Sequence, residues 1–156
     1  MDEIPTNTIL LVEDDQDDVL FMRIAMEKAG LSGRLRVVED GRDAMDYLEG
    51  NGIYADRAAY PMPCLALVDL KLPRMLGIDL LRWIRSSPAY ETMVIIIMSS
   101  SQQRSDIRQA YQLGANSYLV KPSNPLRLAE MIQALKAYWL CLNQPTAECL
   151  PSGSPE

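Results

Sequence analysis

Four short apolar runs in this chain end on polar side chains that could take part in a single reaction. The central run, residues 64–68, lies between Pro63 and Pro73 and is followed directly by Asp69. An apolar run without alternation, bounded by prolines, is typical of a strand that is buried on both faces. On its own, Asp69 would fit equally well as a simple turn residue. The other three runs end on Glu13 and Asp14, on Ser99, and on Lys121.

These groups are expected to converge, because ligands bind outside the carboxyl ends of the strands in open α/β sheets. Glu13, Asp14 and Asp69 would repel one another there, and a divalent cation would relieve that repulsion. Oxygen ligands suit Mg²⁺, with Mn²⁺ as an alternative, whereas a chain without histidine is a poor fit for zinc. A phosphoryl group could then be transferred in line to Asp69, with Lys121 and Ser99 as donors to its oxygens.

The elements that must position these residues alternate between extended and helical patterns five times. Strands are expected over residues 8–13, 34–39, 64–68, 93–98 and 117–120, and helices over 16–29, 41–49, 77–86, 102–113 and 124–142. The pattern predicts an α/β fold with a doubly wound, five-stranded parallel sheet in the flavodoxin-like order 2-1-3-4-5, with helices on both faces. In the fourth helix the predicted inward residues are Ile107, Ala110, Tyr111 and Leu113.

Composition narrows the function classes. The 156 residues carry a formal net charge of −6, so no basic surface for nucleic acid is expected. No apolar run is long enough for a transmembrane helix, and the acidic start does not resemble a signal peptide. Three cysteines without metal-ligand spacing fit a reducing cytoplasm. Without histidine, neither a Ser-His-Asp triad nor a phosphohistidine donor can form.

The domain organisation predicted from these patterns is simple. Residues 1–7 form a polar lead-in, residues 8–143 one compact domain, and residues 144–156 a flexible tail rich in Pro and Ser. Residues 50–63 have no clear period and are expected to form a long loop. The last predicted helix is apolar nearly all round at residues 137–142, which favours a further surface that covers it.

Taken together, the acids, hydroxyl and lysine resemble the receiver domain of two-component response regulators. The resemblance covers about residues 8–142. It implies that Asp69 is the phosphoacceptor, that Asp14 binds the metal directly and Glu13 through water, and that the Lys71 carbonyl is a further ligand. It also implies a switch hydroxyl at Ser99 and an aromatic switch residue at Tyr118. Lys121 matches the lysine of the family, and the bond before Pro122 is expected to be cis.

The phrases at residues 12–18, 110–118 and 138–143 are similar to those of small stand-alone regulators that partner phytochrome-type histidine kinases. This similarity implies a homodimer through the fourth helix, fifth strand and fifth helix, and that face is expected to carry the signal by protein–protein contact. Lys71 and Ser101 occupy the positions that set the lifetime of the phosphoryl group in the family. Leu76 departs from the family pattern, in which Asp is frequent before the glycine at position 77.

Two other function classes remain open from the sequence. A phosphatase of the haloacid dehalogenase kind also uses an Asp after a strand, but it places a second Asp two residues later, where Lys71 stands here. A receiver-like adaptor that never needs phosphate would keep the fold without the chemistry. Nucleotide binding is less favoured, because no glycine-rich loop follows the first strand.

Overall fold

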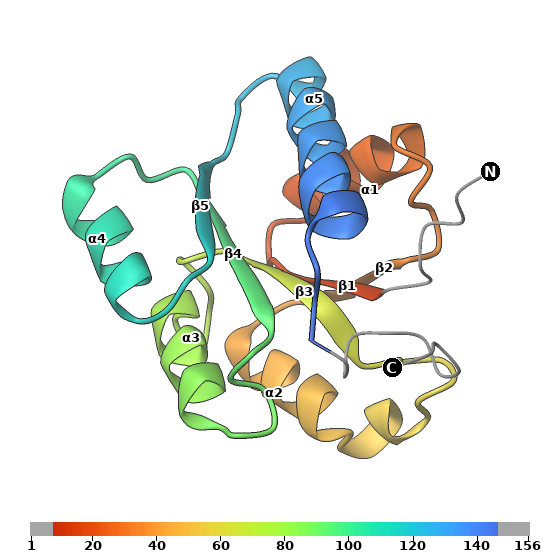
Figure 1. Ribbon diagram of the computed structural model, residues 1–156, viewed down its shortest axis with the longest axis vertical. Helices are drawn as coiled ribbons and strands as arrows, with labels where there is room; N and C mark the ends of the chain where they lie inside the picture. The colour runs from red at the N-terminus through yellow and green to blue at the C-terminus, as the bar shows by residue number, and fades with distance from the viewer. Residues whose placement is uncertain (1–7, 147–156) are drawn as a thin grey trace.

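The computed structural model describes residues 8–146, and its centre is a five-stranded parallel sheet. The strand order is β2-β1-β3-β4-β5, which confirms the predicted doubly wound α/β fold (Figure 1). The strands are β1 Thr8–Val12, β2 Leu35–Val38, β3 Pro63–Val68, β4 Val94–Ser99 and β5 Ser117–Val120. The predicted lead-in and the part of the predicted tail from residue 147 onward lie outside the described residues.

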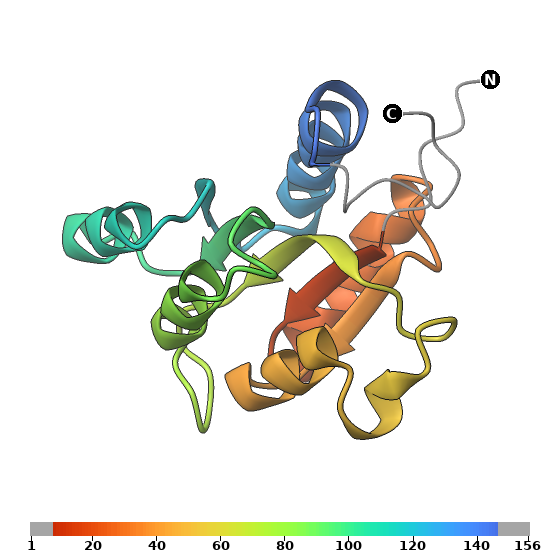
Figure 2. The same ribbon diagram turned by 60° about the horizontal axis from the view of Figure 1, so that its bottom comes forward.

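Helices cover both faces of the sheet. They are α1 Gln16–Lys28, α2 Gly41–Glu49, α3 Gly77–Ser86, α4 Arg104–Gln112 and α5 Pro125–Leu135. Helices α1 and α5 lie on one side of the sheet, and α2 and α3 lie on the other, as the two layers in Figure 2 show. None of the helices in this described part of the chain is long and apolar enough to cross a bilayer.

Alternate residues of the central strands feed two separate cores, which explains why these strands are apolar without alternation. Leu10 and Ala66 point to the side of α2, α3 and α4, whereas Leu11 and Leu67 point to the side of α1 and α5. All five residues of β1 and all six of β3 are buried. The sheet is therefore held from both sides, and the carboxyl ends of its strands are fixed in register.

The segment between α2 and β3 is more ordered than the loop predicted over residues 50–63. It contains a 3₁₀-helix, Gly52–Ala55, and its tyrosines pack on α2, with Tyr54 and Tyr47 ring centroids 5.0 Å apart. Arg57 donates 2.7 and 2.8 Å hydrogen bonds to the carbonyls of Tyr47 and Leu48 at the end of α2. This segment is held by aromatic packing and by the bonds from Arg57 to backbone carbonyls. These contacts leave no helical or strand period in the sequence, which is why the segment was predicted as a loop.

Two helix predictions need correction. The single helix predicted over residues 124–142 is α5 followed by a π-helix, Lys136–Leu142, in which the Asn143 N–H reaches back five residues to Tyr138. The wider turn begins where the Lys136 ammonium bonds the Ala29 carbonyl at 2.7 Å. In α4, Tyr111 is exposed rather than inward, because it lies about 100° around the helix from the buried Ala110.

Candidate functional site: an acid cluster and a lysine at the strand ends

The carboxyl ends of β1 and β3 bring three acids together. Val12 pairs with Val68 in the sheet, and the Asp69 N–H donates to the Val12 carbonyl at 3.2 Å. This register places one carboxylate oxygen each of Glu13, Asp14 and Asp69 within 4.8 Å of one another. Glu13 is buried, Asp69 is half-buried and Asp14 is exposed, so the cluster opens to solvent on the Asp14 side.

Lys121 enters the same site from the end of β5. Its backbone N–H donates to the Ser99 carbonyl at 2.8 Å, which continues the β4–β5 ladder one residue beyond the strand. Its ammonium forms ion pairs with Glu13, with Asp69 at 2.8 Å and with Asp18 at 2.9 Å. We call Lys121 and the carboxylates of Glu13, Asp14, Asp18 and Asp69 the acid side of the site.

Burial and hydrogen bonds to charged partners shift the pKa values of the acid side in opposite directions. Burial raises the pKa of Glu13 to about 7, and the hydrogen bond from Lys121 opposes that rise only in part. Burial also disfavours the charged form of Lys121, but hydrogen bonds to Asp69, Glu13 and Asp18 outweigh it and raise the pKa of the lysine. The lysine is therefore a permanent cation, and an added cation in the cluster would favour the ionised form of Glu13.

Asp69 is held by its own backbone surroundings. Its Oδ1 accepts a 3.2 Å hydrogen bond from the Lys71 N–H, and the Gly77 N–H bonds the Leu70 carbonyl at 3.0 Å. A Cβ at position 77 would lie 2.0 Å from the Asp69 carbonyl oxygen. Only glycine allows this close approach, so the packing of Gly77 at the start of α3 fixes the backbone position of Asp69.

A second group of residues, which we call the hydroxyl side, joins the end of β4 and the strand β5 to α4. The buried Ser99 hydroxyl accepts a 3.2 Å hydrogen bond from the Ser101 N–H. The Tyr118 hydroxyl donates to the Ser101 carbonyl at 2.9 Å, and the Ser101 hydroxyl donates to Asp106 in the first turn of α4. The hydroxyl side consists of Ser99, Ser101, Tyr118 and Asp106. Its hydrogen bonds join neutral groups, except that the Ser101 hydroxyl donates to the carboxylate of Asp106.

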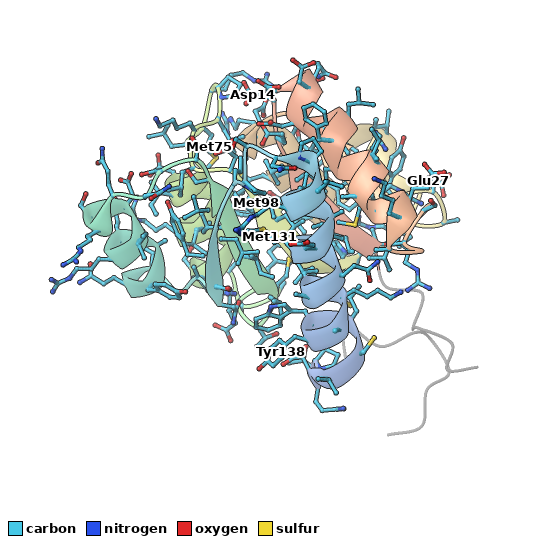
Figure 3. The ribbon with its side chains drawn as sticks, turned by 90° about the horizontal axis from the view of Figure 1, so that it is seen from above. Asp14, Glu27, Met75, Met98, Met131 and Tyr138 are labelled. Carbon is cyan, nitrogen blue, oxygen red and sulfur yellow. The ribbon has the colours of Figure 1, made fainter. Side chains whose placement is uncertain are left out.

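The acid side and the hydroxyl side line two different hollows on the surface. The acid side opens into a cleft lined by Glu13, Asp14, Asp15, Gln16, Asp17, Asp18, Asp69, Ser100, Lys121, Pro122 and Ser123. The hydroxyl side lines a second hollow with Leu70, Lys71, Leu76, Ile78, Ser99, Ser101, Asp106 and Gln109. Asp14 and Met75 lie at the same end of the molecule in Figure 3, and Tyr138 lies at the opposite end.

One site expectation is wrong, and two contacts were missed. The bond before Pro122 is trans, as is every peptide bond in residues 8–146, and trans is the intrinsically preferred form of an X–Pro bond. Sequence reasoning missed the pairing of Lys121 with Asp18, although Asp18 stands in the acidic run that opens α1. It also missed the ion pair of Arg74 with the buried Asp40, for which the sequence offers no periodic signal.

The donor set of the acid side fits a hard divalent cation. Three carboxylate oxygens within 4.8 Å, one of them on a solvent-exposed residue, leave room for bound water. Neither histidine nor thiolate lies in this cluster, so the set is unsuited to zinc. The residues present therefore match Mg²⁺ or Mn²⁺ by ligand chemistry.

A doubly wound five-stranded domain with an acid cluster and a lysine at its strand ends belongs to the class of signalling receiver domains. The profile of the family described as "Response regulator receiver domain" matches residues 9–133. The chain belongs to this family, which confirms the resemblance seen in the sequence.

Several relatives match nearly the whole chain. The probable methanogenesis regulatory protein FilR2 of Methanothrix harundinacea is 34% identical, with 87% of this chain and 85% of the relative covered. The structure of the phosphorylated cyanobacterial phytochrome response regulator RcpA is 30% identical, covers 90% of this chain and 99% of its own, and has a TM-score of 0.83. The Mn²⁺-bound form of response regulator Rcp1, from Synechocystis, covers the same shares at 30% identity and a TM-score of 0.80.

Proposed function

We propose that this protein accepts a phosphoryl group on Asp69 from a sensor histidine kinase, in a reaction that depends on Mg²⁺ or Mn²⁺. The observation that carries the proposal is the joint placement of the acid cluster and Lys121, with the ammonium 2.8 Å from Asp69 Oδ2. Membership of the receiver family and the phosphorylated state of its relative RcpA support the same reaction. The protein is then a phosphoacceptor in its own phosphorylation and dephosphorylation rather than an enzyme for other substrates.

In this proposal the cation is held by Asp14 and Asp69 directly, by Glu13 through water, and by the backbone carbonyl of Lys71. When bound, the cation supplies positive charge that keeps Asp69 ionised and offsets the charge of the phosphoryl group. The solvent-exposed side of the cluster at Asp14 supports a site that keeps several waters. The Mn²⁺-bound structure of Rcp1 supports the choice of a hard divalent ion.

The transfer itself requires little of the protein beyond positioning. One oxygen of Asp69 forms a bond to phosphorus while the bond from phosphorus to the kinase imidazole breaks, and the imidazole keeps the electron pair. Lys71 N–H and Lys121 each hold one oxygen of Asp69, at 3.2 and 2.8 Å, so the carboxylate is oriented before the donor arrives. Lys121 then donates to a phosphoryl oxygen, and the product is an acyl phosphate.

The readout in this proposal begins at the hydroxyl side. Ser99 moves toward the phosphoryl group, Tyr118 turns inward, and the face of α4, β5 and α5 changes its affinity for a partner. The Tyr118 hydroxyl already bonds the Ser101 carbonyl at 2.9 Å, which supports a mechanical connection between the β4–α4 loop and β5. Figure 1 shows α4 at one edge of the molecule, with β5 between α4 and α5.

The lifetime of the acyl phosphate is assigned to Lys71 and Ser101. Lys71 is exposed beside Asp69, so its side chain can approach the phosphoryl oxygens and hinder attack by water. Ser101 acts less directly, because its hydroxyl bonds Asp106. A Lys71→Asn variant should lose its phosphoryl group faster than the wild type, as followed by the decay of the phosphorylated protein, and an unchanged decay rate would remove Lys71 from this role.

We also propose a phytochrome-type kinase as the donor and a homodimer as the assembled form. The likeness to the phytochrome response regulator RcpA supports the kinase type. The exposed Tyr138 and Leu142, at 54% and 71% exposure, give the end of the last helix an apolar surface that a second copy would cover. Transfer from a phytochrome-type kinase at a rate no higher than from an unrelated histidine kinase would count against the kinase assignment.

Sedimentation tests the central proposal. Wild type and Asp69→Asn are compared with and without Mg²⁺ and beryllofluoride, a stable mimic of an acyl phosphate. The proposal expects beryllofluoride to change the sedimentation of the wild type alone, and only in the presence of Mg²⁺. A constitutive dimer that still binds beryllofluoride would retain Asp69 as the acceptor and move the readout to kinase or partner binding. A wild type that fails to bind beryllofluoride would favour the phosphate-independent adaptor.

A further inference from the structure

Asp18 is a fourth carboxylate at the acid side, and it comes from a different element than the other three. It lies in the first turn of α1, after the N-cap Asp15, and its Oδ2 is 2.9 Å from the Lys121 ammonium. Its side chain is 43% exposed, against 3% for Glu13 and 11% for Asp69. Asp18 therefore connects the lysine to the helix at the open edge of the cleft.

The hydrogen-bond capacity of Lys121 is fully used in this arrangement. A lysine ammonium has three N–H donors. These donors meet three carboxylates, those of Glu13, Asp18 and Asp69. A phosphoryl oxygen on Asp69 can receive a bond from Lys121 only if one of the present acceptors gives up its donor.

The acceptors differ in what else they would bind. Glu13 and Asp69 belong to the group of three acids whose ligand atoms lie within 4.8 Å, and Asp18 does not. A cation in that group would draw Glu13 and Asp69 toward itself and away from Lys121. Two donors of Lys121 then become free for a phosphoryl oxygen, and Asp18 is the carboxylate that continues to hold the ammonium near α1, so it competes for the position of the ammonium.

We propose that Asp18 is a positioning residue that competes with the phosphoryl group for the Lys121 ammonium. Its competition lowers the affinity of the site for that group. The inference rests on the proposed function, since it assumes a phosphoryl group on Asp69. Asp18 acts through Lys121 and does not touch the reacting atoms. Its negative charge at the edge of the cleft adds direct repulsion of an anionic group.

The neighbouring Asp17 provides a matched control. It lies in the same first turn of α1 and lines the same cleft, and it forms no ion pair with Lys121. Asp17→Asn and Asp18→Asn therefore change the net charge and the helix dipole interaction equally. Asn at position 18 keeps the size of the side chain and an acceptor oxygen, so the ammonium keeps a neutral partner.

Isothermal titration calorimetry of full-length wild type, Asp17→Asn, Asp18→Asn and Asp69→Asn measures two affinities, for Mg²⁺ alone and for beryllofluoride at saturating Mg²⁺. Asp18→Asn should bind beryllofluoride about three- to tenfold more tightly than wild type, and Asp17→Asn should stay within about twofold. Neither variant should bind Mg²⁺ more tightly. A loss of fold would weaken both affinities, so the tighter binding of only one ligand separates competition for Lys121 from a structural effect.

Three results would overturn the inference. Equal gains in Asp17→Asn and Asp18→Asn would mean that surface charge alone acts on the site. Unchanged or weaker beryllofluoride binding by Asp18→Asn, with wild type binding normally, would mean that Asp18 does not compete, and the proposed function would stand. Absence of binding by wild type, or equal binding by Asp69→Asn, would overturn the proposed function and this inference together.

Discussion

The acid side and the hydroxyl side of the site are held together by different interactions. On the acid side, one lysine is bonded to carboxylates that follow β1 and β3 and to one in α1, and little of the ion-pair network is exposed except at Asp18. On the hydroxyl side, Ser101 receives a bond from Tyr118 and gives one to Asp106. Removing a partner from a buried ion network costs several kcal/mol, and losing a neutral hydrogen bond costs about 1 kcal/mol.

This difference suits two tasks. In the proposed function, a network of charges with little freedom keeps the carboxylate of Asp69 oriented for the reaction. A chain of weak bonds between loop, helix and strand can exist in two arrangements that differ little in free energy, which a switch requires. In the proposed function, the acid side carries the chemistry and the less strongly bonded hydroxyl side carries the response, and four substitutions test that division.

The largest effect is expected for Lys121→Met. The variant leaves Glu13 and Asp69 facing each other without their cation, so the metal-free protein should lose about 3 kcal/mol of unfolding free energy. Mg²⁺ should restore more stability to the variant than it adds to wild type, as urea unfolding with and without Mg²⁺ would measure. The matched control is Lys136→Met, whose ammonium bonds one carbonyl, and it should cost about 1 kcal/mol with or without Mg²⁺. Equal losses in the two variants would contradict the prediction.

Gly77→Ala should come next. Its Cβ would stand 2.0 Å from the Asp69 carbonyl oxygen, so the chain must shift and about 2 kcal/mol of stability should be lost. Beryllofluoride binding should weaken as well, because the displaced residue is the proposed phosphoacceptor. Gly33→Ala measures backbone strain alone, since Gly33, unlike Gly77, has a positive φ, of 83°, and has no atom within 4 Å of the added carbon. Thermal unfolding would separate the contact from the backbone strain, and equal melting temperatures would reject the contact.

Tyr118→Phe should have a smaller effect, on the hydroxyl side alone. It removes the donor to the Ser101 carbonyl and should cost about 1 kcal/mol. The Mg²⁺ affinity should stay unchanged, because no charge at the acid side is altered. Tyr111→Phe, on the exposed surface of α4, is the control with no expected effect on either quantity. A drop in Mg²⁺ affinity in Tyr118→Phe would show that the two sides are not separable.

Ser101→Ala should be the mildest of the four. Its hydroxyl bonds Asp106 and accepts a 3.3 Å bond from the Gln103 N–H at the start of α4, so about 0.5 to 1 kcal/mol should be lost. A double-mutant cycle with Asp106→Ala should give a coupling energy of about 0.5 kcal/mol by urea unfolding. Ser100→Ala, one residue earlier and exposed, serves as the control. A coupling of zero would mean that the Ser101–Asp106 bond does not stabilise α4.

Several elements were predictable because each depends on neighbours in the chain. The helices α2 and α3 begin and end where the apolar period and the glycine and serine breaks predict. The continuous apolar runs identify β1 and β3 as strands covered on both sides, as their complete burial confirms. The π-helix and the exposed Tyr111 were mispredicted, because an extended apolar period does not state where a helix widens or which side of it meets the sheet.

What the sequence by itself determined is the set of polar residues at the strand ends and the order of the strands, because periodicity, chain connectivity and handedness are local or topological rules. Only the tertiary structure decided which of these residues meet. Lys121 and Asp18 are separated by more than a hundred positions, and Arg74 meets Asp40 across two loops. Such contacts arise when packed elements bring distant side chains within reach, and no local pattern along the chain records them.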